Sequence, residues 1–399
     1  MTTRPADTVS QRPAMMLLAS GLEEAKSVAG RIDASGRWPE VIRWCGEAKV
    51  LPALGNRLRL CHHTLPPAEG AQLVRGTALQ FVETTRCLSE GVRASNLLAA
   101  AGIPCAAFKG CAVLAQLYDG PQDRMLQDVD LLIRKADLPA ALEHLQSQGY
   151  RAGIGADSLE DYLGFIRNSP GAAGNEAMSL RGSAGNSIDL HWKLGSFDTE
   201  MLLESAVPTK VLNTVSRMIR PAFGLLLTVH HALRNDFVPR EMARDVLDCA
   251  RWFRLMDENA EEKKVALEQA RKCGLEAGLG AMARLVGEFG GARSFGDLAV
   301  GGASEALAGL YLHQLDRGAV STDLNYLVSP VAWRQILTGM ISGSKRYVGL
   351  MREFEAANGE ESLPLVQRVG RLALAAVRTS PKQWRQVRYL AVEKCRLRS

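Results

Sequence analysis

The stretch DRMLQDVDLLI, residues 123–133, places two aspartates two positions apart inside an apolar run. The segment DVDLLI has the composition of a buried strand, where an ionised carboxylate is costly unless a partner neutralises it. Residues i and i+2 of a strand share one face, so Asp128 and Asp130 point together while Val129 and Leu131 face the core. The pattern indicates either that both carboxylates face water on a strand edge, or that a positive group lies between them.

The residues before this strand are a second candidate site. IPCAAFKG (103–110) is a short apolar run that ends in glycine and predicts a strand, and CAVLAQLY (111–118) predicts a helix directly after it. Glycine lets backbone N–H groups approach a ligand, and a helix N-terminus favours anions. Lys109 and Gly110 could therefore hold a phosphate, although a glycine at a strand end is also common without any ligand.

A later stretch, IDLHWKL (188–194), alternates apolar residues with Asp189, His191 and Lys193. This alternation predicts a strand with one polar face, which can lie on a sheet surface without any function. If the strand pairs with DVDLLI, Asp189 joins the two earlier aspartates, and three carboxylates without a ligand would raise one another's pKa values. A divalent metal ion would resolve that conflict, because Mg²⁺ binds carboxylates together with substrate phosphates and water.

Helical patterns lie on both sides of this unit. We therefore expect an α+β fold that is mostly helical, with a small mixed sheet flanked by N- and C-terminal helical regions. A glycine-rich stretch at 167–187 is typical of a hairpin or a mobile lid. The expected organisation is a disordered 1–14, a helical region 15–100, an α/β core 101–195, a helical domain 196–362 and basic amphipathic helices 363–399.

Composition narrows the class of protein. The chain has 399 residues, of which 47% are hydrophobic, and no run reaches the roughly 18 apolar residues of a membrane span. The N-terminus does not resemble a signal peptide. The eight cysteines include no CxxC pair, which argues against zinc-ribbon and thioredoxin folds. Scattered thiols of this kind favour a reducing cytoplasm.

Charge is distributed unevenly along the chain. Residues 363–399 carry nine lysines and arginines and one acid, a net +8, whereas the whole chain carries +5, so the rest carries about −3. The body is therefore not expected to offer an extended nucleic-acid surface. The basic tail could contact an anionic membrane or an acidic partner, or it could pack its apolar face on its own protein.

These segments together resemble a known family. AGIPCAAFKGCAVLAQLYDGPQDRMLQDVDLLI (101–133), followed by IDLHWKL, resembles the nucleotidyltransferase family of bacterial proteins within the polymerase-β-like superfamily. The superfamily pattern is a glycine with a small partner, a spacer, Asp-apolar-Asp-apolar, and a third acid on a later strand. The similarity covers roughly residues 40–255. Two departures are Cys111, where the superfamily usually has serine or glycine, and a longer spacer before Asp128.

The resemblance implies a polymerase-β-like core that transfers a nucleoside monophosphate from an NTP to an unknown hydroxyl acceptor, either a small molecule or a protein, with release of pyrophosphate. Asp128 and Asp130 would hold Mg²⁺ and bridge to the nucleotide phosphates. Asp189 would bind a second metal ion and help to deprotonate the acceptor. The residues implied to bind the nucleotide are Lys109, Gly110, Cys111, Arg124 and His191.

Some roles stay open at this stage. Arg124 could clamp a phosphate or pair with Asp128. His230 and His231 are expected to be packed in an apolar helix, and Asp245 to pair within the helical domain or to reach the cleft. Two functions from other classes compete with the enzyme, namely a catalytically silent nucleotide-binding or scaffold protein with the same fold, and a membrane-surface assembly factor.

Overall fold

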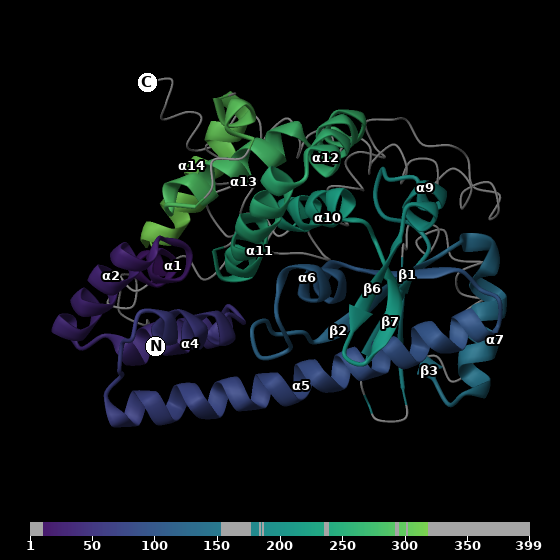
Figure 1. Cartoon of the computed structure of the whole chain (residues 1–399), viewed down its shortest axis with the longest axis horizontal. Helices are drawn as coiled ribbons and strands as arrows, with labels where there is room; N and C mark the ends of the chain where they lie inside the picture. Colours follow the sequence, from purple (N-terminus) through teal and green to yellow (C-terminus); the bar gives the residue numbers. More distant parts are fainter. Residues whose placement is uncertain are drawn as a thin grey trace, which may run out of the picture.

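The computed structural model of the chain describes residues 11–152, 177–182, 185, 187–234, 239–291, 295–300 and 302–317 (Figure 1). Most of the glycine-rich stretch 167–187 lies outside the described residues, and so does the whole basic tail 363–399. In the part of the chain that is described, no helix is both long enough and apolar enough to cross a bilayer. The seven cysteines in that part are free thiols.

The N-terminal region is helical, as predicted, but it begins earlier than expected. Residues 11–14 were predicted to be disordered, yet the first helix starts at Gln11 and buries Ala14 completely. The reason is packing, because the apolar side of this short helix joins the main hydrophobic core. The helices of this region are α1 (Gln11–Ala19), α2 (Leu22–Ser35), α3 (Trp38–Glu47), α4 (Leu51–Leu60) and α5 (Pro67–Ala100).

A seven-stranded mixed sheet forms the centre of the molecule, with strand order β3-β4-β5-β2-β1-β7-β6. The predicted strand DVDLLI is β2, which pairs antiparallel with β1 and parallel with β5. The expected fold class, a mostly helical α+β protein around a small mixed sheet, is confirmed. The strands are β1 (Cys105–Phe108), β2 (Asp128–Ile133), β3 (Arg151–Ala152), β4 (Ala177–Arg181), β5 (Ser187–His191), β6 (Val207–Val211) and β7 (Thr214–Met218).

Two of these strands lie where only helices were predicted. The hairpin of β6 and β7 follows residue 196, and β7 joins the sheet parallel to β1. The hairpin lies at the sheet edge and buries few residues, so its sequence, VPTKVLNTVSRM, carries only a weak apolar alternation. The sheet therefore extends to Met218, beyond the boundary expected at 195.

The remaining helices cover the sheet and build the C-terminal half. They are α6 (Lys109–Leu117), α7 (Leu138–Ser147), α9 (Thr199–Glu204), α10 (Pro221–Arg234), α11 (Pro239–Glu258), α12 (Ala260–Cys273), α13 (Glu276–Glu288) and α14 (Gly302–Arg317), with short 3₁₀ turns at Lys135–Asp137 and Gly296–Val300. Helices α10 and α11 pack on each other and on α6. This contact brings the C-terminal helices beside the strand-to-helix junction at Lys109.

The long helix α5 determines which face of the sheet is open. It runs from beneath α4 to α7 and contacts β1, β2 and β5 (Figure 1). A side chain at Gly91 would place its Cβ 2.6 Å from Cγ1 of Val129, so this glycine allows the helix to lie directly on β2. Because side chains alternate along a strand, Asp128 and Asp130 point to the opposite face, toward α10 and α11.

Candidate active site

Strand pairing brings together the acidic residues that the sequence singled out. In the parallel ladder between β2 and β5, Asp130 is the direct partner of Asp189, and Asp128 lies two residues before Asp130 on the same face. Adjacent strands are about 4.8 Å apart, so partner side chains on one face are close neighbours. The pairing of DVDLLI with IDLHWKL, which was the condition for grouping the three aspartates, is present.

Asp130 is only 4% exposed, and two positive or proton-donating side chains contact its carboxylate. Nζ of Lys109 donates to Oδ1 of Asp130 at 2.6 Å, and Nε2 of His191 lies 2.8 Å from the same oxygen. Burial alone would raise the pKa of Asp130, but the hydrogen bond from His191 and the charge of Lys109 outweigh it and hold that pKa below its ordinary value. The buried aspartate of β2 is therefore ionised and paired.

Lys109 reaches Asp130 from an unusual backbone conformation. Its φ is 46°, in the left-handed region that residues other than glycine rarely adopt. The strand β1 ends at Phe108 and α6 starts at Lys109, so this one residue turns the chain from strand to helix. The turn directs the ammonium group back over β2, where it also lies 5.2 Å from the ring centre of Phe108.

Asp128 is the exposed first residue of β2 and has a different electrostatic environment. Partial burial of its carboxyl group, followed by the charges of Asp130 and Asp189, raises its pKa above the ordinary value, while Lys109 and Arg244 act in the opposite direction. A raised pKa means that its negative charge is incompletely compensated.

Asp189 lies between β2 and β4. Its carboxylate accepts a hydrogen bond from the hydroxyl of Ser179, its partner on β4. Ligand atoms of Asp130, Asp189 and His191 all lie within 4.8 Å of one another, close enough together that the three residues could hold one metal ion. Among the described residues this group differs from the predicted set, because His191 takes part and Asp128 does not.

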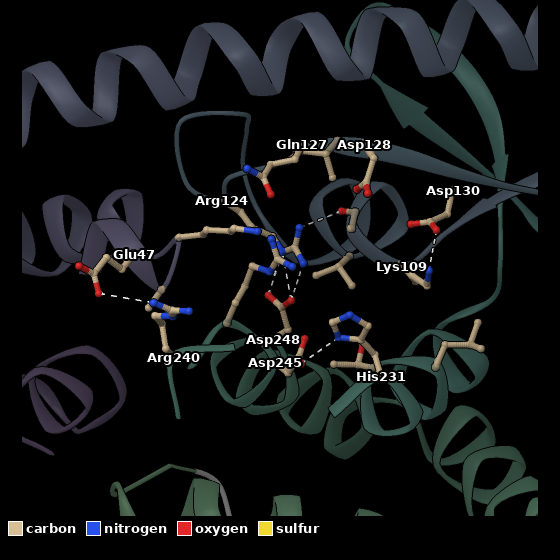
Figure 2. Close-up of a pocket in the computed structure, with 18 residues that line it drawn as sticks. Glu47, Lys109, Arg124, Gln127, Asp128, Asp130, His231, Arg240, Asp245 and Asp248 are labelled. Carbon is tan, nitrogen blue, oxygen red and sulfur yellow. Dashed lines mark hydrogen bonds and ion pairs between the residues drawn. The ribbon is translucent and has the colours of Figure 1, made fainter. Parts of the chain in front are cut away.

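A pocket opens beside these acids, and Figure 2 shows its two walls. Asp128, Asp130 and Lys109 lie on one wall, and His231, Asp245 and Asp248 from α10 and α11 lie on the other (Figure 2). The remaining charged or polar lining residues are Glu47, Lys49, Arg124, Gln127, Thr228, Arg240 and Arg244. The pocket is therefore built from the sheet, the helices that follow it, and the turn after α3.

Arg124 lines the pocket, and of its two open roles the pairing with Asp128 is not found, because its ion-pair partner is another aspartate. Its guanidinium instead binds Asp248 of α11, with Nη2 2.7 Å from Oδ2 and Nε 3.0 Å from Oδ1. The hydroxyl of Tyr118 also donates to Oδ1 of Asp248, at 2.7 Å. Both members of the pair are buried, which leaves this guanidinium engaged within the protein.

Gly110 and Cys111 lie in the first turn of α6, where backbone N–H groups lack intrahelical partners. A Cβ at Gly110 would lie 2.5 Å from Cδ1 of Leu126 and 3.1 Å from Nη1 of Arg124, so glycine here permits close packing of the loop before β2. The thiol of Cys111 is buried, and burial raises its pKa to about 12. Only the backbone of Cys111 is therefore suited to meet a phosphate.

The helical wall contains a second histidine–aspartate contact. Nδ1 of His231 lies 2.9 Å from Oδ2 of Asp245, whose side chain is 5% exposed. Asp245 therefore pairs within the helical domain and also lines the pocket, so both expectations for it hold. Lys49, Arg240 and Arg244 also line the pocket and were not predicted, because their positions depend on contacts between segments distant in the sequence.

The chain is similar in sequence to a known protein family. Residues 34–291 match the sequence profile of a family described as uncharacterised nucleotidyltransferase. No curated protein matches the chain.

Two solved structures are similar over about half of the chain. The solution structure of the antibiotic-resistance factor ANT(2'')-Ia is 14% identical, with a TM-score of 0.31, covering 49% of this chain and 96% of that one. A crystal structure of an antigenic nucleotidyltransferase-like protein from Paracoccidioides brasiliensis is 15% identical, with a TM-score of 0.29, covering 50% of this chain and 92% of that one. Because the family profile spans more than half of its length, the chain belongs to the uncharacterised nucleotidyltransferase family and is a nucleotidyltransferase.

Proposed function

We propose that the protein transfers a nucleoside monophosphate from an NTP to a hydroxyl group and releases pyrophosphate, in a reaction that requires Mg²⁺. The observation that carries the proposal is the parallel pairing that sets Asp130 opposite Asp189, with Asp128 beside them at the pocket. Three carboxylates on two neighbouring strands, next to the N-terminus of a helix, suit a divalent cation and a phosphate chain together.

The donor set fits a hard divalent cation. Asp128, Asp130 and Asp189 offer carboxylate oxygens, which Mg²⁺ prefers, and the raised pKa of Asp128 reports negative charge that the protein leaves incompletely compensated. These three residues would hold the metal, and His191 would orient Asp130 by its hydrogen bond. When bound, divalent ions would stabilise charge on the attacking and leaving oxygens of an in-line displacement.

The chain's own groups have separate tasks in this proposal. Lys109, whose side chain is 32% exposed, contacts Asp130, lines the pocket and can donate to a phosphate oxygen. The free N–H groups at the start of α6, including those of Gly110 and Cys111, favour the same negative charge. Asp189 would accept the proton of the acceptor hydroxyl. The hydroxyl oxygen would bond to the α-phosphorus, and the bond between the α-phosphorus and the oxygen that bridges to the β-phosphate would break, which releases pyrophosphate.

The test combines binding and transfer. Purified protein with Mg²⁺ and each of four α-labelled NTPs is incubated with cell extract, and the labelled product identifies the acceptor as a small molecule or a protein. We expect label transfer with at least one NTP and its loss in Asp189→Asn. The matched control is Asp257→Asn, an acid-to-amide change in a surface pair with Lys263, which should transfer normally.

A catalytically silent nucleotide-binding protein of the same fold predicts another result. Such a protein would be stabilised by Mg²⁺ and an NTP without transferring label to any component of the extract. Stabilisation without transfer would therefore overturn the enzymatic proposal and favour the silent scaffold.

A further inference from the structure

We infer that Lys49 and Arg244 form a subsite for the β- and γ-phosphates of the NTP, on the pocket wall contributed by the helical regions. This basic subsite, defined by those two residues, rests on the proposed function. It assigns the phosphate-binding role that Arg124 does not take, because the guanidinium of Arg124 is bound to Asp248. It also makes the N-terminal helical region part of the active site, since Lys49 follows α3.

Among the described residues, every basic residue that lines the pocket has an acidic partner, except Lys49 and Arg244. Four contacts join a basic group to an acid, namely Lys109–Asp130, Arg124–Asp248, His231–Asp245 and Arg240–Glu47. Lys49 and Arg244 line the same pocket, and neither side chain has an ion pair or a hydrogen bond within the described part of the chain. The remaining acid that lines the pocket is Asp128, which has no ion pair within the described part of the chain.

Arg244 carries the first independent observation. Its Nε atom is buried and has no hydrogen-bond partner among the described residues. Buried donors are nearly always paired in native proteins, so an orphan of this kind on a pocket wall indicates a missing acceptor.

Lys49 carries the second observation. It lies in the short turn between α3 and α4 with φ at 60°, a left-handed conformation that lysine rarely adopts. Its backbone N–H donates to the carbonyl of Gly46 at 3.1 Å, which fixes the turn. Strained residues of this kind cluster at ligand sites, where the surrounding structure holds a side chain in position.

The chemistry of the two walls points to the terminal phosphates. The acids and the N-terminus of α6 occupy the wall where the α-phosphate and its metal would bind. Two uncompensated cations on the facing wall match the charge of a pyrophosphate group, and a guanidinium can bind phosphate oxygens in a bidentate manner. A phosphate on the acceptor would satisfy the same two cations, so the test must separate these two sources.

Isothermal titration calorimetry of the full chain separates them with three probes, all with Mg²⁺, namely the preferred NTP, the corresponding NMP, and inorganic pyrophosphate. We expect Lys49→Gln and Arg244→Gln each to weaken NTP and pyrophosphate binding roughly tenfold, since each removes a charge-assisted contact. NMP affinity should change less than about twofold, because that ligand lacks the two terminal phosphates. Arg244→Lys, which retains the charge, should recover part of the loss.

Two exposed residues outside the pocket provide matched controls, Arg254→Gln on α11 and Lys272→Gln on α12. Both should bind all three probes as the unmodified protein does. Equal weakening of NMP and NTP would overturn the subsite, and so would unchanged NTP and pyrophosphate binding in the two pocket variants. The second result would instead favour an acceptor phosphate as the occupant.

The outcomes also distinguish this subsite from the proposed function. If the unmodified protein binds pyrophosphate, loses it in Lys49→Gln and yet transfers no label, the subsite stands and the transfer reaction falls. If label transfer occurs while both variants bind like the unmodified protein, the reaction stands and the subsite falls. Failure of the unmodified protein to bind pyrophosphate overturns the subsite directly.

Discussion

Arg124 and Asp248 form a buried ion pair with 2.7 Å between Nη2 and Oδ2, and neither side chain is more than 5% exposed. The pair joins the loop before β2 to α11, which are 124 residues apart in the sequence. The same guanidinium is within hydrogen-bonding distance of the Gly110 carbonyl, at 3.4 Å. This contact therefore fixes the helical wall of the pocket relative to the wall that carries the aspartates (Figure 2).

Replacing Arg124 should cost folding stability. Arg124→Gln leaves the Asp248 carboxylate buried without its cation, a change that typically costs about 3–5 kcal/mol. Urea denaturation measures the free energy of unfolding. The control is Arg134→Gln, which breaks an exposed pair with Glu200 and should have little effect. An unchanged free energy of unfolding in Arg124→Gln would show that the pair does not hold the two walls together.

The backbone at Lys109 leads to a second prediction. Both Lys109→Ala and Lys109→Gly remove the ammonium group from Asp130, but only glycine relaxes the left-handed φ of 46°. The alanine variant should therefore be less stable than the glycine variant by about 1 kcal/mol. Chemical denaturation of the pair measures this difference directly, and equal stabilities would argue against strain at the strand-to-helix junction.

Local patterns predicted the two strands that carry the aspartates. An apolar run predicted the strand of Asp128 and Asp130, and an alternating pattern predicted the strand of Asp189. Parallel pairing of these strands then brings Asp130 and Asp189 together. These features depend on residues that are neighbours in the sequence or on a single strand contact. The sequence left open whether these carboxylates face water or lie beside a positive group, and the contact between Lys109 and Asp130 supports the second alternative for Asp130.

Contacts between segments that are distant in the sequence could not be predicted from local patterns. Nothing near Arg124 indicates that its partner is Asp248, and nothing near Lys49 indicates that the turn after α3 reaches the pocket. Both depend on how α11 and the N-terminal helices pack around the sheet. The hairpin of β6 and β7 was missed for another reason, because its exposed edge carries too few buried residues to give a clear period.

The two aspartates of β2 should respond oppositely to neutralisation in metal-free protein. Asp130→Asn removes a buried charge that Lys109 and His191 both contact, so it should lower stability at pH 7 by about 1–3 kcal/mol. Asp128→Asn removes a repelled charge and should leave stability unchanged or higher. Thermal unfolding in EDTA measures both, and a stabilising Asp130→Asn would contradict the assigned pairing.

The pH dependence of the same two variants follows from the directions of the pKa shifts. The lowered pKa of Asp130 gives stability that is present above the ordinary value near 4 and is lost as the pH falls through the folded-state pKa. The raised pKa of Asp128 gives stability that is present below about 4 and is lost as the pH rises through the folded-state pKa. The loss of unfolding free energy in Asp130→Asn should therefore become smaller in acid. Any increase of unfolding free energy in Asp128→Asn should become larger toward neutral pH.

The last prediction concerns Asp189 and the metal. Its carboxylate is close to Asp130 and His191, with ligand atoms of all three within 4.8 Å, so it should bind Mg²⁺ directly. A ligand at one hundred times its Kd stabilises a fold by about 2.7 kcal/mol, and Asp189→Asn should lose most of the stabilisation by Mg²⁺ and an NTP.

Ser179→Ala tests the alternative that Asp189 serves only its hydrogen bond to the neighbouring strand. If that bond were its whole role, Ser179→Ala would reproduce the loss in Asp189→Asn. We expect instead that Ser179→Ala retains the metal response, while the surface control Asp257→Asn behaves as the unmodified protein. Retention of the full Mg²⁺ response in Asp189→Asn would remove Asp189 from the metal site.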